Sequence, residues 1–148
     1  MQIETTRLIL REMNEEDFDD LYCVLADSDI MLHYPYTFDE KRVRGWIEKN
    51  QERYQIFGFG LWAVCLKENG KMIGDCGLTL QPIGNTIKPE IGYHIQKTYQ
   101  RKGYAKEAAI AVRDWAFTHT PFQTIYSYMK STNLQSMQTA QAYGCQRV

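Results

Sequence analysis

The sequence reads Glu90-Ile91-Gly92-Tyr93-His94-Ile95 at residues 90–95 and Gln100-Arg101-Lys102-Gly103-Tyr104-Ala105 at residues 100–105. The first stretch is largely apolar, which favours a β-strand. The second opens a pattern of small and apolar residues at helical spacing, so a helix is predicted to begin there. We expect a strand, a short turn and a helix in succession, with these residues on one helix face: Ala105, Ala108, Ala109, Val112 and Ala116.

The turn between this strand and helix has the properties of an anion-binding site. The first N–H groups of a helix are unpaired and lie at the positive end of its dipole, so they bind a pyrophosphate readily. Arg101 and Lys102 add positive charge, and Gly103 lets a phosphate approach the backbone because it has no Cβ. The small Ala105 keeps the first helical turn close to such a ligand. The alternative is an ordinary strand-to-helix turn with a solvated basic pair.

The pattern Gln-x-x-Gly-x-Ala in residues 100–105 resembles the acyl-CoA-binding signature of the GNAT acetyltransferase superfamily. The resemblance implies that acetyl-CoA binds here as a co-substrate, held by Gln100, Arg101, Lys102, Gly103, Tyr104 and Ala105. A nucleotide-phosphate protein unrelated to CoA is a weaker alternative, because the Gly-x-x-x-x-Gly-Lys-Ser/Thr and Gly-x-Gly-x-x-Gly patterns are absent from the sequence.

Length and composition predict a single domain over residues 1–148. A chain of 148 residues can bury a hydrophobic core without the support of disulfides or bound metals. The formal net charge of −1 argues against a broad phosphate-binding surface, so we expect no nucleic-acid partner. The apolar runs are shorter than a bilayer span, and residues 1–4 lack the basic start and apolar core of a signal peptide. We therefore expect a cytoplasmic protein without a membrane partner.

The four cysteines predict neither a metal site nor a disulfide framework. They are scattered along the chain, without a Cys-x-x-Cys pair and without histidines at ligand spacing. We interpret them as reduced thiols in apolar settings: Cys23, Cys65, Cys76 and Cys145.

Local signals predict the remaining elements. Asn14 is expected to cap a first helix with Asp17 in the capping-box position, and Thr37 or Asp39 is expected to cap a second. Asn69-Gly70 indicates a hairpin turn. The expected strands are 7–11, 59–66, 72–80, 90–95 and 122–129, with a polar loop at 81–88, and the expected helices are 18–25, 39–54, 102–117 and 133–143.

Hairpin-connected strands before a single parallel crossover place the chain in the α+β class. The order also resembles the GNAT fold from residue 3 to 144, which implies a mixed, mostly antiparallel sheet flanked by helices. The opening Thr5-Thr6-Arg7-Leu8-Ile9-Leu10-Arg11 is similar to the first strand of the ribosomal-protein-alanine N-acetyltransferase-like branch, where Thr-x-Arg-Leu-x-Leu-Arg is typical.

The resemblance implies transfer of an acetyl group from acetyl-CoA to a primary amine, on a protein N-terminus or a small molecule, by direct attack in a ternary complex. In this pattern the strand splays from its neighbour, and the backbone of Tyr93, His94 and Ile95 holds the pantetheine arm. Glu90 is then the general base. Because strand residues alternate between faces, Glu90 and His94 share one face and both could address the substrate. The alternative for Glu90 is a solvated charge beside Lys88.

A second element that the resemblance singles out is Asn133-Leu134-Gln135-Ser136, which matches Asn-x-x-Ser/Ala. It implies that Asn133 holds the pantetheine. Many family members place a tyrosine seven residues after this asparagine to protonate the leaving thiolate, but Ala140 stands there. Ser136 is then the replacement acid, unless the thiolate leaves unassisted.

The amine side of the site is expected to come from the first two helices and the loop between them. This loop contains acids and aromatics that would suit a cationic amine, although such loops are also simply soluble: Asp27, Asp29, His33, Tyr34, Tyr36 and Asp39. The tryptophans at 46, 62 and 115 are interpreted as core residues.

Two further expectations concern assembly and the alternative function. The GNAT fold continues after its last helix with two strands, for which residues 145–148 are too few, so strand 122–128 would keep an open edge. This predicts a shortened member of the family, or a homodimer that covers the edge. The alternative to catalysis is a non-catalytic acyl-CoA-binding sensor or interaction module.

Overall fold

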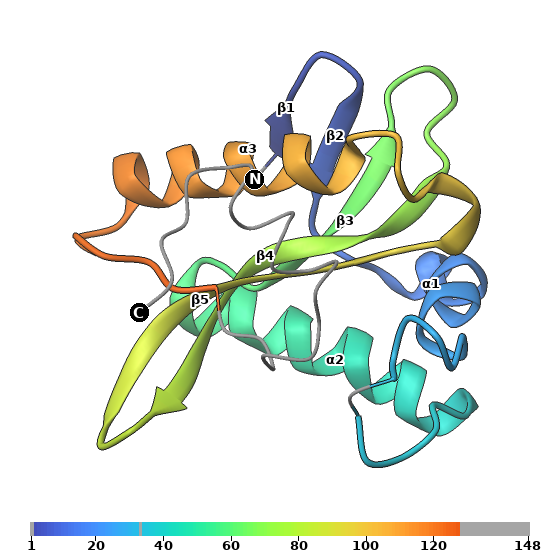
Figure 1. Ribbon diagram of the computed structural model, residues 1–148, viewed down its shortest axis with the longest axis horizontal. Coiled ribbons are helices and arrows are strands. Elements are labelled where there is room, and N and C mark those ends of the chain that lie inside the picture. The colour runs from blue at the N-terminus through green and yellow to red at the C-terminus, as the bar shows by residue number, and fades with distance from the viewer. Residues whose placement is uncertain (1, 33, 128–148) are drawn as a thin grey trace.

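The computed structural model describes residues 2–32 and 34–127, which Figure 1 shows as a sheet between helices. Within these residues, five strands form one antiparallel sheet in chain order. Helix α3 (Tyr104–His119) covers one face, while α1 (Phe18–Leu25) and α2 (Glu40–Phe57) lie on the other. The strands are β1 (Gln2–Glu4), β2 (Leu8–Arg11), β3 (Leu61–Leu66), β4 (Met72–Ile83) and β5 (Thr86–Ile95).

Capping side chains start the helices where the sequence predicts. Asn14 and Asp17 form the expected capping box, which opens a short 3₁₀ turn (Glu15–Asp17) that leads into α1. The Asp17 carboxylate also receives both terminal nitrogens of Arg11, at 2.7 and 2.9 Å, which ties this turn to the end of β2. Asp39, rather than Thr37, caps α2 by accepting the N–H of Arg42 at 2.9 Å.

The β4–β5 hairpin is longer than expected. The predicted polar loop at 81–88 is wrong, because these residues continue the ladder through the pairs Gln81↔Lys88 and Pro82↔Ile87. Only Gly84 and Asn85 connect the two strands. A two-residue turn that begins with glycine suits the twist of a hairpin, so a polar composition here does not indicate a loop.

The sheet is buried on both faces, and every residue of β3 is buried. On one face, fully buried alanines of α3 let the helix approach the sheet closely. On the other face, apolar side chains of α1 and α2 pack on alternate residues of β3. The first core includes Trp62, Val64, Ile73, Leu78, Ile91, Ala108, Ala109 and Val112, and the second includes Leu21, Val24, Val43, Ile47, Leu61, Ala63 and Cys65.

The segment after α3 returns to the outer edge of β5. The N–H of Ile91 donates to the Tyr126 carbonyl at 2.7 Å, and the N–H of Tyr126 donates to the Pro89 carbonyl at 2.8 Å. Glu90 and Tyr126 thus form an isolated parallel bridge, whereas a strand over 122–129 was predicted. Through residue 127 the prediction is met only at this bridge, and the predicted helix 133–143 lies outside the described residues.

The described residues also bear on the predictions about the cysteines and about membrane-spanning segments. Cys65 and Cys76 are buried free thiols, but Cys23 is exposed, so its predicted apolar setting is wrong; Cys145 lies outside the described residues. No helix in residues 2–32 and 34–127 is long and apolar enough to span a membrane.

Candidate functional site

The predicted strand, turn and helix around residues 90–105 are present. After β5 a short 3₁₀ turn (Lys97–Tyr99) leads to Arg101 and Gly103, whose φ angles are 62° and 83°. Helix α3 then begins at Tyr104, two residues later than predicted, and no described side chain caps its N-terminus. The first N–H groups of α3 therefore remain available to an anion.

Arg7 holds this turn against the start of β2. Its guanidinium donates to the Lys102 carbonyl at 2.9 Å and pairs with Glu107 of α3 at 2.7 Å. It also lies 4.3 Å from the centre of the Tyr104 ring. Burial opposes ionisation of Glu107, but hydrogen bonds from Thr5 and Arg7 outweigh it and lower the pKa of this carboxyl. In the sequence, Arg7 was noted only as part of the segment that resembles the first strand of the family branch, and Glu107 was not singled out.

Gln100 shapes the same turn from the other side. Its side-chain amide donates to the carbonyl of Ile95 at 2.9 Å, so the turn is tied to the end of the strand that precedes it. The glutamine of the Gln-x-x-Gly-x-Ala pattern thus makes a contact within the protein, while its predicted contact with acetyl-CoA stays a prediction.

The backbone of β5 faces two directions in alternation. Ile91 pairs outward with Tyr126, so Tyr93 and Ile95, which have the same parity, direct their backbone groups to the same outer edge. His94 faces inward, because a Cβ on Gly74 of β4 would lie only 2.0 Å from its carbonyl oxygen. Tyr93 and Ile95 thus have the orientation that the predicted pantetheine contact requires, and that contact stays a prediction. His94 directs its backbone to β4, and its side chain belongs to the α2 side of the sheet.

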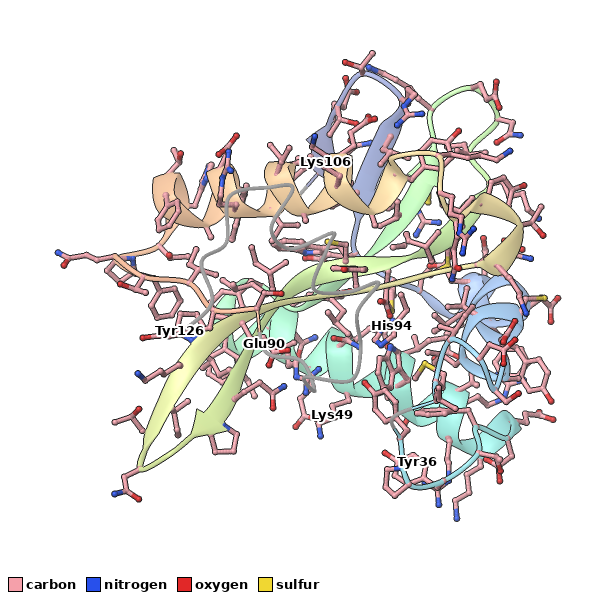
Figure 2. The ribbon with its side chains drawn as sticks, viewed as in Figure 1. Tyr36, Lys49, Glu90, His94, Lys106 and Tyr126 are labelled. Atoms are coloured by element: carbon pink, nitrogen blue, oxygen red, sulfur yellow. The ribbon has the colours of Figure 1, made fainter. Side chains whose placement is uncertain are left out.

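Three successive cross-strand pairs lie on the α2 side of the β4–β5 ladder: Asp75↔His94, Gly77↔Gly92 and Thr79↔Glu90. Figure 2 shows Glu90 and His94 following one another along β5. Burial raises the pKa of Glu90 from 4.5 to about 7, against the opposing effect of the His94 charge. The predicted alternative of a solvated charge beside Lys88 does not hold, because Glu90 is half-buried and Lys88 donates to the Tyr126 hydroxyl at 3.0 Å.

His94 belongs to a hydrogen-bonded cluster centred on Asp75. The Asp75 side chain is 0% exposed, and its two oxygens lie 2.8 Å from His94 Nδ1 and 3.1 Å from Trp46 Nε1. His94 Nε2 lies 3.4 Å from the hydroxyl of Tyr34. Burial, with the charge of Asp75, raises the pKa of Tyr34 to about 12, so its hydroxyl keeps its proton near neutrality.

Sequence reasoning missed Asp75 and the hydrogen bond of Trp46, which packs against the second core as predicted. A single aspartate within the apolar strand Met72–Ile83 is the signal that could have found the first, since a buried carboxylate needs a partner. Trp46 was predicted as a core residue, but its indole N–H is committed to Asp75. His33 lies outside the described residues, and His119 is exposed and stacks on Trp115 with ring centres 4.9 Å apart.

The acids of the loop between α1 and α2 serve the loop itself. Asp27 accepts the N–H of Asp29 at 2.9 Å, Asp39 caps α2, and Asp29 forms an exposed ion pair with Lys97. The expectation that these acids receive a cationic amine therefore gains no support. Of the loop aromatics, Tyr34 makes a tilted contact with His94, and it packs edge-on against Phe38 of the loop and Trp46 of α2.

The site thus combines an uncapped helix start, suited to an anion, beyond the end of β5 with a carboxyl in the middle of β5 whose pKa burial raises to about 7. Asn133 and Ser136, which were predicted to hold the pantetheine and to protonate the thiolate, lie outside the described residues. Among the residues with a described position, no three His, Cys, Asp or Glu side chains are grouped to hold a metal ion.

Known proteins share this architecture. A family profile described as "Acetyltransferase (GNAT) domain" matches residues 7–146. The "Uncharacterized protein YkkB" of Bacillus subtilis (strain 168) is 32% identical over 144 residues, which cover 97% of this chain and 84% of the relative. The acetyltransferase from Agrobacterium tumefaciens str. C58 has a crystal structure that matches with a TM-score of 0.84 and 29% identity, over 97% of this chain and 82% of that chain.

A structure of RimL, the ribosomal L7/L12 alpha-N-protein acetyltransferase, in complex with coenzyme A also matches. Its TM-score is 0.79 at 19% identity, over 97% of this chain and 83% of that chain. At this identity the likeness concerns the fold alone, and at that level it confirms the predicted similarity to ribosomal-protein acetyltransferases.

Proposed function

Since this chain belongs to the GNAT acetyltransferase family and is an N-acetyltransferase, we propose that acetyl-CoA is its donor and a primary amine, on a protein N-terminus or a small molecule, its acceptor. The observation that carries the proposal is the position of Glu90. This half-buried carboxyl lies on the strand that leads into the anion-binding turn, and its pKa of about 7 suits a base that works near neutrality.

The donor is proposed to lie along the outer edge of β5. Its pyrophosphate would meet the turn of Arg101, Lys102 and Gly103, where the first N–H groups of α3 point outward. Its pantetheine arm would then follow the edge to which Tyr93 and Ile95 direct their backbone groups, as an added strand does. This arrangement brings the thioester toward the bridge at Glu90.

The acceptor is proposed to approach from the α2 side. A primary amine is mostly an ammonium ion at neutral pH, and it attacks only after losing a proton. Glu90 takes that proton, directly or through water, and the nitrogen then attacks the thioester carbon. As the C–N bond forms and the tetrahedral adduct collapses, the C–S bond breaks and its electron pair leaves on the CoA sulfur. Ser136 is the proposed proton donor to that sulfur.

The test is the release of CoA thiol from acetyl-CoA in the presence of amine panels: peptides with free N-termini, amino acids and polyamines. The wild type should release thiol with at least one panel, and the alkaline rise of kcat/KM through about pH 7 should be absent in Glu90→Gln. Acetyl-CoA that protects the fold against heat, without thiol release from any panel, would indicate the acyl-CoA-binding module instead.

A further inference from the structure

Amide formation from an ammonium ion removes two protons from the same nitrogen. The first must leave before attack, and the second must leave before or during collapse of the tetrahedral adduct. Glu90 accounts for one of them in the proposed function. A base for the other proton has to lie on the α2 side of β5, because the nitrogen approaches from there.

We infer that His94, positioned by the buried Asp75, is the acceptor of the second proton. His94 is the next titratable side chain on the face that carries Glu90, four residues further along β5, so their backbones are roughly 13 Å apart and Gly92 lies midway between them. This inference rests on the proposed acetyl transfer and adds a second catalytic residue to it.

The hydrogen bonds of Asp75 select one form of the imidazole. An ionised carboxylate only accepts hydrogen bonds, and the two oxygens of Asp75 face His94 Nδ1 and Trp46 Nε1. Nδ1 therefore carries a proton, and in the neutral ring the lone pair is on Nε2. Nε2 lies 3.4 Å from the protonated hydroxyl of Tyr34, a long hydrogen bond, and is the basic atom of the ring.

Two features leave room beside the His94 ring: its side chain is incompletely buried, and the neighbouring position on the same face is Gly92, which has no side chain. The His94 side chain retains 15% of its exposure, whereas its partner Asp75 has none. Between Glu90 and His94 the face of β5 carries no side chain, and a Cβ on Gly92 would meet only Leu61 Cδ2, at 3.8 Å. A nitrogen atom above Gly92 would have the carboxyl on one side and the imidazole on the other.

The complete step balances in protons and electrons. The ammonium gives one proton to Glu90, and its lone pair forms the C–N bond while the thioester carbonyl π pair moves to oxygen. His94 Nε2 takes the second nitrogen proton as that pair returns and the C–S bond breaks toward sulfur. Before Ser136 protonates the sulfur, the species present are the amide, the CoA thiolate, neutral Glu90 and an imidazolium whose charge is matched by Asp75.

Three titratable groups face His94 from the elements around it. They are Asp75 of β4, Tyr34 of the loop before α2, and Glu90 of β5 itself; Arg53 of α2 acts electrostatically on Tyr34 from further away. Among the residues that the structure describes, Asp75 makes the short contact with the ring, at 2.8 Å. Removal of its charge should make His94 a weaker base, since the imidazolium would lose its counterion.

The first experiment examines the resting protein and needs no acceptor. Long-range ¹H–¹⁵N correlation spectra resolve the ring nitrogens of the three histidines, with His94→Gln used to assign His94. We expect the Nδ1–H form at His94, and a titration midpoint that moves to lower pH in Asp75→Asn. A neutral ring protonated on Nε2 would overturn the inference, and so would a midpoint unchanged in folded Asp75→Asn.

The second experiment measures turnover with the amine that the panels identify. His94→Ala should lower kcat by ~100-fold, a typical loss for a general base, without changing KM for acetyl-CoA. Millimolar imidazole should restore part of this rate, which a purely structural role of His94 would not allow. His119→Ala is the control, because this exposed histidine lies on α3 away from the site, and imidazole should not change its rate.

The outcomes separate the inference from the proposed function. If the wild type turns over and His94→Ala retains its kcat, or if imidazole raises its rate no more than that of His119→Ala, the inference is overturned while the function stands. If the wild type releases no thiol with any amine, the proposed function falls and the inference falls with it.

Discussion

Arg7 and Glu107 are 100 residues apart in the sequence, yet their side chains form an ion pair with Nε and Oε1 2.7 Å apart. Because the same guanidinium also reaches the Lys102 carbonyl, one side chain connects the start of β2, the first turns of α3 and the anion-binding turn between them. The pair lies at the surface, so its main effect is on the position of the turn and not on the stability of the fold.

Replacement of Arg7 should therefore weaken acetyl-CoA binding more than folding. We expect Arg7→Ala to raise the Kd for acetyl-CoA by about tenfold, or ~1.4 kcal/mol, and to change the free energy of unfolding by less than about 1 kcal/mol. Calorimetric titration and urea denaturation measure the two effects. Arg44→Ala removes an exposed ion pair within α2 and should leave the Kd unchanged; an equal loss of affinity in both variants would contradict the prediction.

Gly103 should be required for the donor because its φ of 83° and its missing side chain form the turn. A Cβ there would lie 3.3 Å from the Arg7 guanidinium, so Gly103→Val should disturb both the turn and its clamp. We expect the thermal stabilisation by acetyl-CoA to disappear. Gly70→Val is a matched control, since Gly70 has a φ of 76° in a hairpin turn with open space around it. It should lose stability similarly but keep its response to acetyl-CoA.

Gly92 and Gly77 form one cross-strand pair but should respond to alanine in opposite ways. A Cβ on Gly92 makes only an ordinary contact, so Gly92→Ala should fold normally and raise KM for the amine by filling the space between Glu90 and His94. A Cβ on Gly77 would lie 2.0 Å from the carbonyl oxygen of Gly60, so Gly77→Ala should lower the melting temperature strongly. Unchanged amine kinetics in Gly92→Ala would place the acceptor elsewhere.

Glu90 should make the stability of the fold depend on pH. Burial raises its pKa from 4.5 to about 7, so between these values the folded protein binds more protons than the unfolded chain. Stability is then lost as pH rises through this window, by up to ~3 kcal/mol from this group. Glu90→Gln removes that loss, and its stability relative to the wild type should increase from pH ~5 to pH ~8. Urea denaturation at both pH values checks this, and a constant difference would contradict it.

The elements predicted well from the sequence are those governed by nearby residues. Asn14 with Asp17, Asp39 and Asn69-Gly70 act within a few positions, so caps and turns follow from local rules. Strand β1 was missed because three residues are too few to show alternation. Over residues 122–127 the predicted strand is present only as a bridge at Tyr126, since an alternating pattern does not reveal whether a neighbouring edge accepts the strand.

In the candidate site too, local relationships were predicted from the sequence and relationships between distant residues were not. Alternation along β5 placed Glu90 and His94 on one face, as the structure confirms. Asp75 lies 19 residues from His94 and Glu107 lies 100 residues from Arg7, and such pairs depend on register and on helix placement that local patterns do not encode. The shift of the Glu90 pKa has the same origin, because burial depends on what packs over the strand.

The pair Gly77↔Gly92 also bears on how this enzyme could diverge. A side chain at position 77 would clash with the backbone of Gly60 and Leu61, so substitutions of Gly77 should be selected against. Position 92 is sterically open, and a single codon change there would alter the surface that a nucleophile meets while the scaffold stays intact. If the acceptor binds over Gly92 as proposed, a single substitution at position 92 could change which amine is accepted, whereas position 77 offers no such route.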